Sequence, residues 1–320
     1  MSIYIHIPFC SNICSYCDFA KVFYNEELVN RYLDELSNEI SNNYKGEIVD
    51  TIYIGGGTPT SLSIDQLNKL FSIINIINRS NNCEFTIECN VEDTTFDKLE
   101  LFYANGVNRL SVGVQSFNDK HLIFLNRKHN AKQVHSLLSL AKRVGFKNIS
   151  LDLIYGLPDQ PLLELDEDIS LYMQLDITHI SCYSLIIEEH TKIYVDKINN
   201  IDEDLDADMY NLICTRLKNN GFDHYEISNF SKPGFASKHN LVYWNNEHYY
   251  GFGVGASGYT GNVRYDNTRS VSQYINNNHI MNETIVTKDI DMENEFMLGF
   301  RKVNGKSKDK YLMNLGIHNN

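Results

Sequence analysis

The sequence predicts an α/β protein, because short apolar strands alternate with amphipathic helices along about the first 200 residues. Six such units can be counted, and their alternation is typical of a parallel sheet with right-handed helical crossovers. Periodicity alone leaves both an open sheet and a barrel possible. A second observation favours the barrel, because glycines and polar residues gather at the ends of the expected strands, where barrels carry their chemistry.

The six strands are expected at residues 3–7, 51–54, 85–89, 109–114, 149–154 and 179–183. Helix starts can be read between them. Asn25 precedes two glutamates and an apolar stripe, which predicts an N-cap. Ser63 and Gln66 have the spacing of a capping box, which predicts a helix after the second strand.

The pattern changes after residue 200. A helix through Leu217, a short strand in HYEIS and a Gly- and Tyr-rich region at 230–267 follow, and residues 271–320 suggest short helices and one strand. We therefore predict a barrel domain over residues 1–200 and a smaller α+β extension over residues 201–320.

Composition excludes several classes of protein. The chain is 42 % hydrophobic and 22 % charged, and no apolar run approaches the roughly 20 residues of a membrane span, so we expect no transmembrane helix. Strand-like sequence begins at once, which leaves no room for a leader and predicts a cytoplasmic protein. The net charge of −13 argues against a nucleic-acid partner.

Three of the seven cysteines, Cys10, Cys14 and Cys17, lie within eight residues directly after the first strand. Soft thiolates select an iron–sulfur cluster, zinc or Cu(I). A structural zinc site needs four ligands and would have to recruit His6, Asp18 or a distant cysteine. A four-iron cluster held by three cysteines keeps one iron open for a small molecule. We expect such a cluster, with zinc and unrelated buried thiols as the alternatives.

Other strand ends carry candidate ligand contacts. The run Gly55 to Gly57 permits close backbone approach to a ligand, although a tight turn before Pro59 also explains it. Glu88 is a candidate ligand contact at a strand end, although an exposed strand residue is the usual explanation for such a carboxylate. Asp152 lies in the apolar run SLDLIYG, where an unpaired charge is costly and a partner or ligand is needed.

The C-x-x-x-C-x-aromatic-C pattern, with Tyr16 before the last cysteine, resembles the radical S-adenosylmethionine (SAM) superfamily. The segments YIHIPFC, YIGGGTPT, RLSVGVQSF, LDLIYGLP and YEISNF resemble its coproporphyrinogen-dehydrogenase-like branch over most of residues 1–300. The resemblance implies a partial (β/α)6 TIM-like barrel, a [4Fe–4S] cluster on the three cysteines and an open iron that binds the methionine moiety of SAM. It also implies a reductant, whose electron cleaves SAM to a 5′-deoxyadenosyl radical.

The same resemblance implies the SAM-binding residues. Carboxylates suit ribose hydroxyls and Arg127 suits the substrate carboxylate, although Arg127 alone reads as a solvated surface residue. The implied residues are Tyr4, Tyr16, Gly57, Thr58, Glu88, Gln115, Arg127 and Asp152.

Two features separate functions within this branch. The dehydrogenases carry a further cysteine two residues after the third, where this chain has Phe19, and its CDF sequence resembles a heme-chaperone group. HNLVYW matches that group's H-N-x-x-Y-W heme motif, so His239 is a candidate axial ligand and Tyr243 and Trp244 offer flat apolar surface for a porphyrin. A core histidine beside packed aromatic residues is the alternative.

We therefore expect a chaperone that binds heme and passes it to an acceptor apoprotein. An oxygen-independent coproporphyrinogen III dehydrogenase and a zinc-braced barrel are the alternatives, and no catalytic residue is assigned. Members of the resembled family continue into a further C-terminal domain, whereas this chain ends about twenty residues after EFMLGFR, so part of the cover of the pocket is expected to be missing.

Overall fold

The computed structural model describes residues 1–307, so residues 308–320 of the predicted extension lie outside the described part. Its centre is a sheet of six adjacent parallel strands in chain order. These are β1 (Ser2–Ile7), β4 (Val49–Gly56), β5 (Arg79–Asn90), β6 (Arg109–Gln115), β7 (Asn148–Tyr155) and β8 (His179–Ser184). All six predicted strands are confirmed, and the predicted partial α/β barrel is the observed fold.

Segments from the second half of the chain extend both edges of this sheet. The strands added beyond β1 are β11 (Tyr249–Phe252), which is parallel to it, and then β12 (Ser257–Thr260), β13 (Val263–Asn267) and β14 (Ile280–Ile285) in antiparallel order. Beyond β8 come β10 (Asn229–Ser231) and β9 (Asp223–Glu226), both antiparallel. The boundary near residue 200 remains a prediction, since the later strands continue the same sheet.

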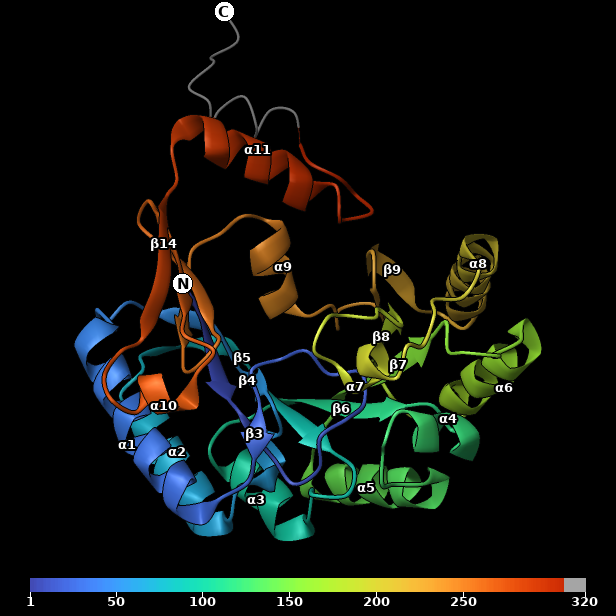
Figure 1. Cartoon of the computed structure of the whole chain (residues 1–320), viewed down its shortest axis with the longest axis horizontal. Helices are drawn as coiled ribbons and strands as arrows, with labels where there is room; N and C mark the ends of the chain where they lie inside the picture. Colours follow the sequence, from blue (N-terminus) through green and yellow to red (C-terminus); the bar gives the residue numbers. More distant parts are fainter. Residues whose placement is uncertain (308–320) are drawn as a thin grey trace, which may run out of the picture.

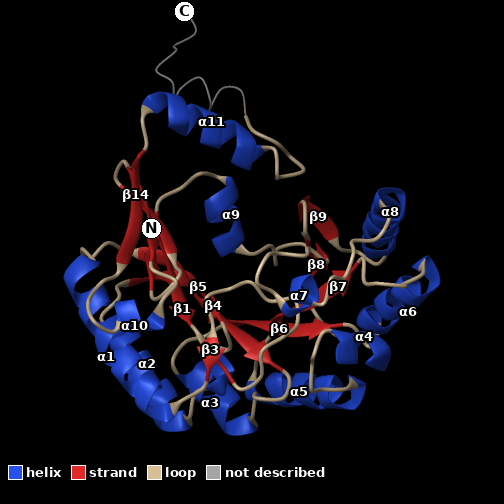
Figure 2. Ribbon diagram, viewed as in Figure 1, coloured by secondary structure: helices blue, strands red, loops and turns tan. Residues whose placement is uncertain are grey.

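Helices lie on both sides of the curved sheet (Figures 1 and 2). The helices are α1 (Glu26–Asn43), α2 (Ile64–Ile74), α3 (Phe96–Ala104), α4 (Asp119–Phe124), α5 (Ala131–Val144), α6 (Leu162–Met173), α7 (Lys192–Val195), α8 (Glu203–Asn219), α9 (Lys238–Trp244), α10 (Val271–Tyr274) and α11 (Lys288–Gly299), with a 3-10 turn at Pro59–Ser61. Helices α1 to α6 and α8 cover the outer face of the sheet, whereas α7, α9 and α11 lie on its inner, open side (Figures 1 and 2). The Asn25 side chain accepts from the Leu28 amide, and the capping box of Ser63 and Gln66 is present, so both predicted helix starts are confirmed.

Alternation along the strands separates an apolar core from a polar interior. In β1, Ile3, Ile5 and Ile7 are fully buried in the main hydrophobic core, whereas Tyr4 and His6 line a cavity. Successive side chains of a strand point to opposite faces, so each strand supplies both environments. The apolar core therefore positions a second, polar set of side chains inside the barrel.

Among the helices of residues 1–307, none has the length and apolarity needed to cross a bilayer.

Candidate functional site

A cavity of about 790 Å³ lies inside the barrel, with walls supplied by all six parallel strands. It brings together most of the residues implied from the sequence. Those that line it are Tyr4, Cys10, Cys14, Tyr16, Cys17, Gly57, Thr58, Glu88, Gln115, Arg127, Asp152 and Tyr243. His239 and Trp244 are not among the lining residues, so the H-N-x-x-Y-W motif reaches the cavity through only part of its residues.

The cysteine loop is held at both ends and in its middle. Two short strands, β2 (Phe9–Cys10) and β3 (Val22–Phe23), pair in parallel around it, and the Tyr24 amide donates to the Cys10 carbonyl over 2.9 Å. Midway, the Ser15 amide donates to the Leu125 carbonyl over 3.2 Å, at the C-terminal end of α4. This loop therefore has a fixed path over the mouth of the cavity.

The neighbours of the thiols suit a bound cluster. A Cβ added at Gly57 would lie 3.0 Å from the Cys10 sulfur and 2.7 Å from the Pro8 carbonyl carbon, so only glycine leaves this space open. Arg127 Nη1 donates to the Cys14 sulfur over 3.3 Å. Burial raises the pKa of the Cys10 thiol to about 12 and also raises that of Cys17, so a metal must displace the protons as it binds.

A structural zinc ion would need four closely grouped ligands. Within residues 1–307, no three histidine, cysteine or acidic side chains are grouped closely enough to hold one metal ion. His6, the nearest candidate for a fourth ligand, donates from Nε2 to the Ala20 carbonyl over 2.8 Å and accepts at Nδ1 from the Tyr4 hydroxyl over 3.0 Å. Both ring nitrogens of His6 are therefore already engaged, which counts against it as a fourth zinc ligand.

Two carboxylates lie below the loop. Glu88 accepts hydrogen bonds from the Tyr53 hydroxyl over 2.8 Å and from the Gly56 amide over 3.0 Å. Burial raises the pKa of Glu88, and burial together with the charge of Glu88 raises the pKa of Asp152 to about 7. A Cβ at Gly55 would lie 2.8 Å from the Glu88 carboxylate. The glycine run therefore makes room for Glu88 as well as for Cys10.

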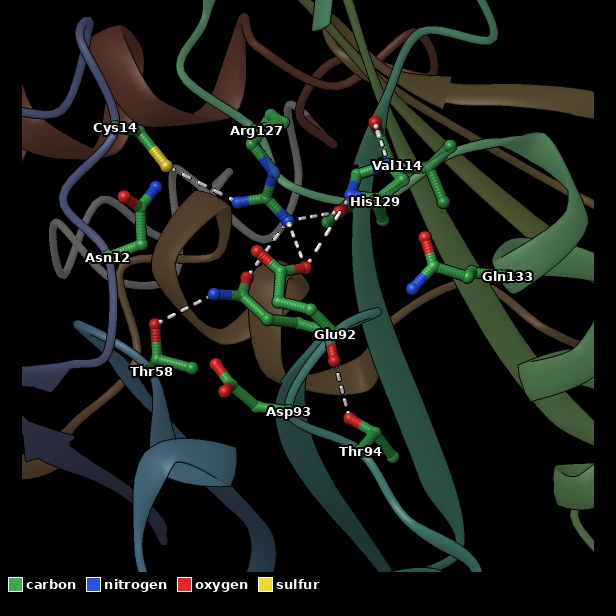
Figure 3. A network of polar contacts seen from close by, with 12 residues as sticks. Asn12, Cys14, Thr58, Glu92, Asp93, Thr94, Val114, Arg127, His129 and Gln133 are labelled. Carbon is green, nitrogen blue, oxygen red and sulfur yellow. Dashed lines mark hydrogen bonds and ion pairs between the residues drawn. The ribbon is translucent and has the colours of Figure 1, made fainter.

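Arg127 is a buried hub rather than a solvated surface residue (Figure 3). Its Nη2 donates to the Gly113 carbonyl over 2.5 Å and to Asn90 Oδ1 over 3.0 Å, and it lies 3.9 Å from Glu92 Oε2. The arrangement ties the cysteine loop to the ends of β5 and β6.

Glu92 and His129 were not identified from the sequence. The Glu92 carboxylate lies 3.5 Å from His129 Nδ1 (Figure 3). Burial raises the pKa of Glu92, but its interactions with His129 and Arg127 outweigh burial and leave that pKa below its usual value. His129 follows Arg127 by two residues, but no pattern marks it, because only the fold brings Glu92 to the pair.

Gln115 ends β6 in an uncommon backbone conformation. Its φ of +73° lies in the left-handed region, and the register between β6 and β7 shifts at this point. A non-glycine residue held there stores local strain, which proteins tend to place at ligand sites. The bulge turns the buried Gln115 toward the cavity.

His239 lies in the first turn of α9, at 1 % exposure. Its Nδ1 is 2.7 Å from Thr51 Oγ1 and its Nε2 is 2.8 Å from the Tyr243 hydroxyl, so both ring nitrogens have partners. Burial, with the charge of Arg109 adding to it, lowers the pKa of His239 to about 3 and keeps the imidazole neutral. Trp244 faces Arg301, whose guanidinium carbon lies 4.5 Å from the indole centroid.

Fold and site together define a partial (β/α)6 barrel with a three-thiol loop over a polar cavity, and comparisons with known proteins agree. The radical SAM superfamily model matches residues 4–172. The chain is 43 % identical to "Heme chaperone HemW" of Bacillus subtilis, covering 98 % of this chain and 87 % of the relative, and 41 % identical to the HemW of Lactococcus lactis, covering 97 % and 84 %. The chain therefore belongs to the radical SAM superfamily and, within it, to the HemW family.

A solved structure supports the fold. Coproporphyrinogen III oxidase (HemN) from Escherichia coli, described as a radical SAM enzyme, superposes with a TM-score of 0.82 at 24 % identity, covering 92 % of this chain and 74 % of that one. Membership of the superfamily implies a [4Fe–4S] cluster and SAM as cofactors.

Proposed function

We propose that this protein is a heme chaperone that holds a [4Fe–4S] cluster and SAM at the cysteine-loop end of the cavity and binds heme through α9. One observation carries the proposal. The neutral imidazole of His239 lies directly behind two cavity-lining side chains, Tyr243 at its Nε2 and Tyr53, which stacks on its ring with centroids 5.1 Å apart. The names of the relatives support the same function.

At the loop end, Cys10, Cys14 and Cys17 would hold the cluster, which supplies an open iron for SAM and an electron for its activation. Glu88 and Asp152 would accept hydrogen bonds from ribose hydroxyls, because both carboxylates line the cavity below the loop. Tyr4, Tyr16, Gly57, Thr58 and Gln115 complete the proposed SAM pocket. Arg127 would attract the methionine carboxylate with charge while its existing bonds fix its position.

At the other end, His239 would bind heme iron through Nε2 after Tyr243 releases it. The contact between Nδ1 and Thr51 Oγ1 can persist, and such a second hydrogen bond orients a metal-binding imidazole. Tyr243 and Trp244 would then provide flat surface beside the porphyrin.

Several further roles belong to the same proposal. A cytoplasmic location, a reductant for the cluster and an acceptor apoprotein for the heme are expected, and no nucleic-acid partner is. The exposed side chains of Phe19 and Ile186 at the lip of the cavity offer apolar surface where an acceptor could receive the cargo.

The alternative, a coproporphyrinogen dehydrogenase, is separated from the chaperone by one experiment. Anaerobically purified and reconstituted protein is loaded with ferric heme and mixed with apomyoglobin as acceptor, and in parallel it is given coproporphyrinogen with SAM and a reductant. We expect an iron–sulfur absorption band, transfer of heme to apomyoglobin faster than heme is released to buffer, and no decarboxylation. Turnover of coproporphyrinogen, or failure to bind heme, would overturn the proposal.

A further inference from the structure

Arg109 is a buried cation on the cavity wall that the proposed cofactor roles do not use. It is the first residue of β6, is 2 % exposed and lines the cavity. Its Nε is buried without an acceptor, and within residues 1–307 its guanidinium has neither a hydrogen bond nor an ion pair. A buried guanidinium without partners is costly, so this arrangement is complete only with an added anion.

The contrast with Arg127 lies in the terminal nitrogens, because Nε is buried without an acceptor in both arginines. Arg127 has a carbonyl, an amide oxygen and a thiol as partners, with Glu92 nearby. Both arginines line one cavity and are similarly buried. The unmet donors of Arg109 are therefore a local property of its place in the barrel.

A residue on the strand next to Arg109 also has a buried polar atom without a hydrogen-bond partner. Thr86 of β5 pairs with Arg109 in the β5–β6 register, and its Oγ1 is also buried without a partner. Nearby acids do not fill the gap. Glu88 is bound by Tyr53 and the Gly56 amide, and no Glu88 or Asp152 oxygen lies within ion-pair distance of Arg109 among the described residues. The charge of Arg109 lowers the pKa of both acids, but burial outweighs it and leaves each pKa raised.

Arg109 also lies toward the α9 end of the cavity, because it pairs with Thr86, Thr86 pairs with Tyr53 of β4, and the Tyr53 ring stacks on His239 with centroids 5.1 Å apart. Its positive charge contributes to the lowered pKa values of two buried histidines, His179 and His239, after the larger effect of burial. His179 is itself fully engaged, with Ser150 Oγ at 2.7 Å and the Tyr225 hydroxyl at 2.8 Å. The free donors of Arg109 thus stand close to the proposed heme ligand.

We propose that Arg109 is the carboxylate-binding residue of the cargo site and receives one propionate of the heme whose iron His239 binds. This inference rests on the proposed heme-chaperone function. The planar fork of a guanidinium matches a carboxylate with two parallel hydrogen bonds, and a dry wall strengthens that pairing. The methionine carboxylate of SAM is left to the cysteine-loop end, near Arg127.

The test uses the reconstituted full chain with ferric heme and with its dimethyl ester, which lacks both carboxylates. Wild-type protein, Arg109→Gln, Arg109→Lys and the exposed control Arg143→Gln are titrated with each ligand, and with SAM. We expect wild type and the control to bind free heme about tenfold or more tightly than the ester, as for a charged hydrogen bond. Arg109→Gln should lose this preference, Arg109→Lys should restore part of it, and SAM affinity should stay unchanged.

The outcomes separate this inference from the function on which it rests. If neither the wild-type protein nor any variant binds heme, the proposed function fails and the inference fails with it. If heme binds but Arg109→Gln keeps the full preference over the ester, only the inference fails. A loss of SAM affinity with an unchanged heme preference would assign Arg109 to the SAM carboxylate and overturn the inference.

A second measurement needs no heme. If Arg109 awaits a ligand, Arg109→Gln removes an unpaired buried charge, so the melting temperature of the ligand-free protein should stay the same or rise. A fall of several degrees, with Arg143→Gln unchanged, would show that the guanidinium stabilises the fold itself and would contradict the proposal.

Discussion

The two ends of the cavity differ in how their polar groups are satisfied. At the cysteine-loop end, both terminal nitrogens of Arg127 are hydrogen-bonded and the loop is fixed by backbone contacts. At the α9 end, His239 is closed off by Tyr243 and Arg109 has no partner in the described part of the chain. The difference indicates a preformed site at the loop end and a site that must open at the α9 end.

The largest effect is expected from a substitution that disrupts only the cysteine-loop end of the cavity. Cys14→Ser should abolish the cluster, because three thiolates are the fewest that hold it. The iron–sulfur absorption of the reconstituted protein measures this, with Cys83→Ser, which lies outside the loop, as the matched control. Full absorption in Cys14→Ser would mean that the loop is not the cluster site.

Arg127→Gln should weaken the same end by another route. It removes three hydrogen bonds and takes the cation from the partly buried Glu92, so the free energy of unfolding should fall by about 3–5 kcal/mol. Denaturant titration compares it with Arg143→Gln, whose exposed side chain should change little. A loss as small as that of the control would show that the Arg127 hub does not hold the loop end together.

Asp152 should make stability depend on pH. Its pKa of about 7 in the fold lies above its ordinary value of 3.8, so the folded state holds a proton that the unfolded state releases. The contribution of Asp152 to stability is therefore greatest below about pH 4 and is lost as the pH rises through 7. Asp152→Asn should raise the free energy of unfolding at pH 8 by up to about 4 kcal/mol.

That gain should shrink toward zero near pH 4, where the carboxyl is protonated in both states. Unfolding curves at pH 4 to 8 check it, with the exposed Asp208→Asn as control. A benefit that is equal at both pH values would contradict the raised pKa.

The smallest effect is expected at the α9 end of the cavity. Tyr243→Phe removes one hydrogen bond from His239 Nε2, worth about 1 kcal/mol, so heme should bind several times more tightly. Heme titration measures the change, and the surface variant Tyr103→Phe should leave affinity unaltered. Weaker heme binding in Tyr243→Phe would mean that the hydroxyl contacts the heme instead of closing the site.

Much of the loop end could be predicted from the sequence, because its ligands sit at strand ends or within one short loop. The spacing of the three cysteines and the apolar run around Asp152 are local signals. Glu92 and His129 carry no such signal, because only the fold brings Glu92, in the turn after β5, to Arg127 and His129 in the segment between α4 and α5. The left-handed backbone of Gln115 was equally hidden, since its residue type does not favour φ above zero.

The α9 end was harder to predict for a physical reason. HNLVYW identifies the residues, but whether an imidazole faces a cavity or a hydroxyl depends on Thr51 and Tyr243, which the fold brings to either side of it. From the sequence, Arg109 could be assigned only as the first residue of a strand. Its lack of partners is visible only when the barrel wall around it is assembled.

The most direct test of the account is low-temperature electron paramagnetic resonance of the ferric heme-loaded protein, which reports the axial ligand. The account predicts an imidazole-ligated heme in wild type and in Tyr243→Phe, and loss of that signature in His239→Ala while the cluster absorption is retained. An unchanged heme signal in His239→Ala would contradict it.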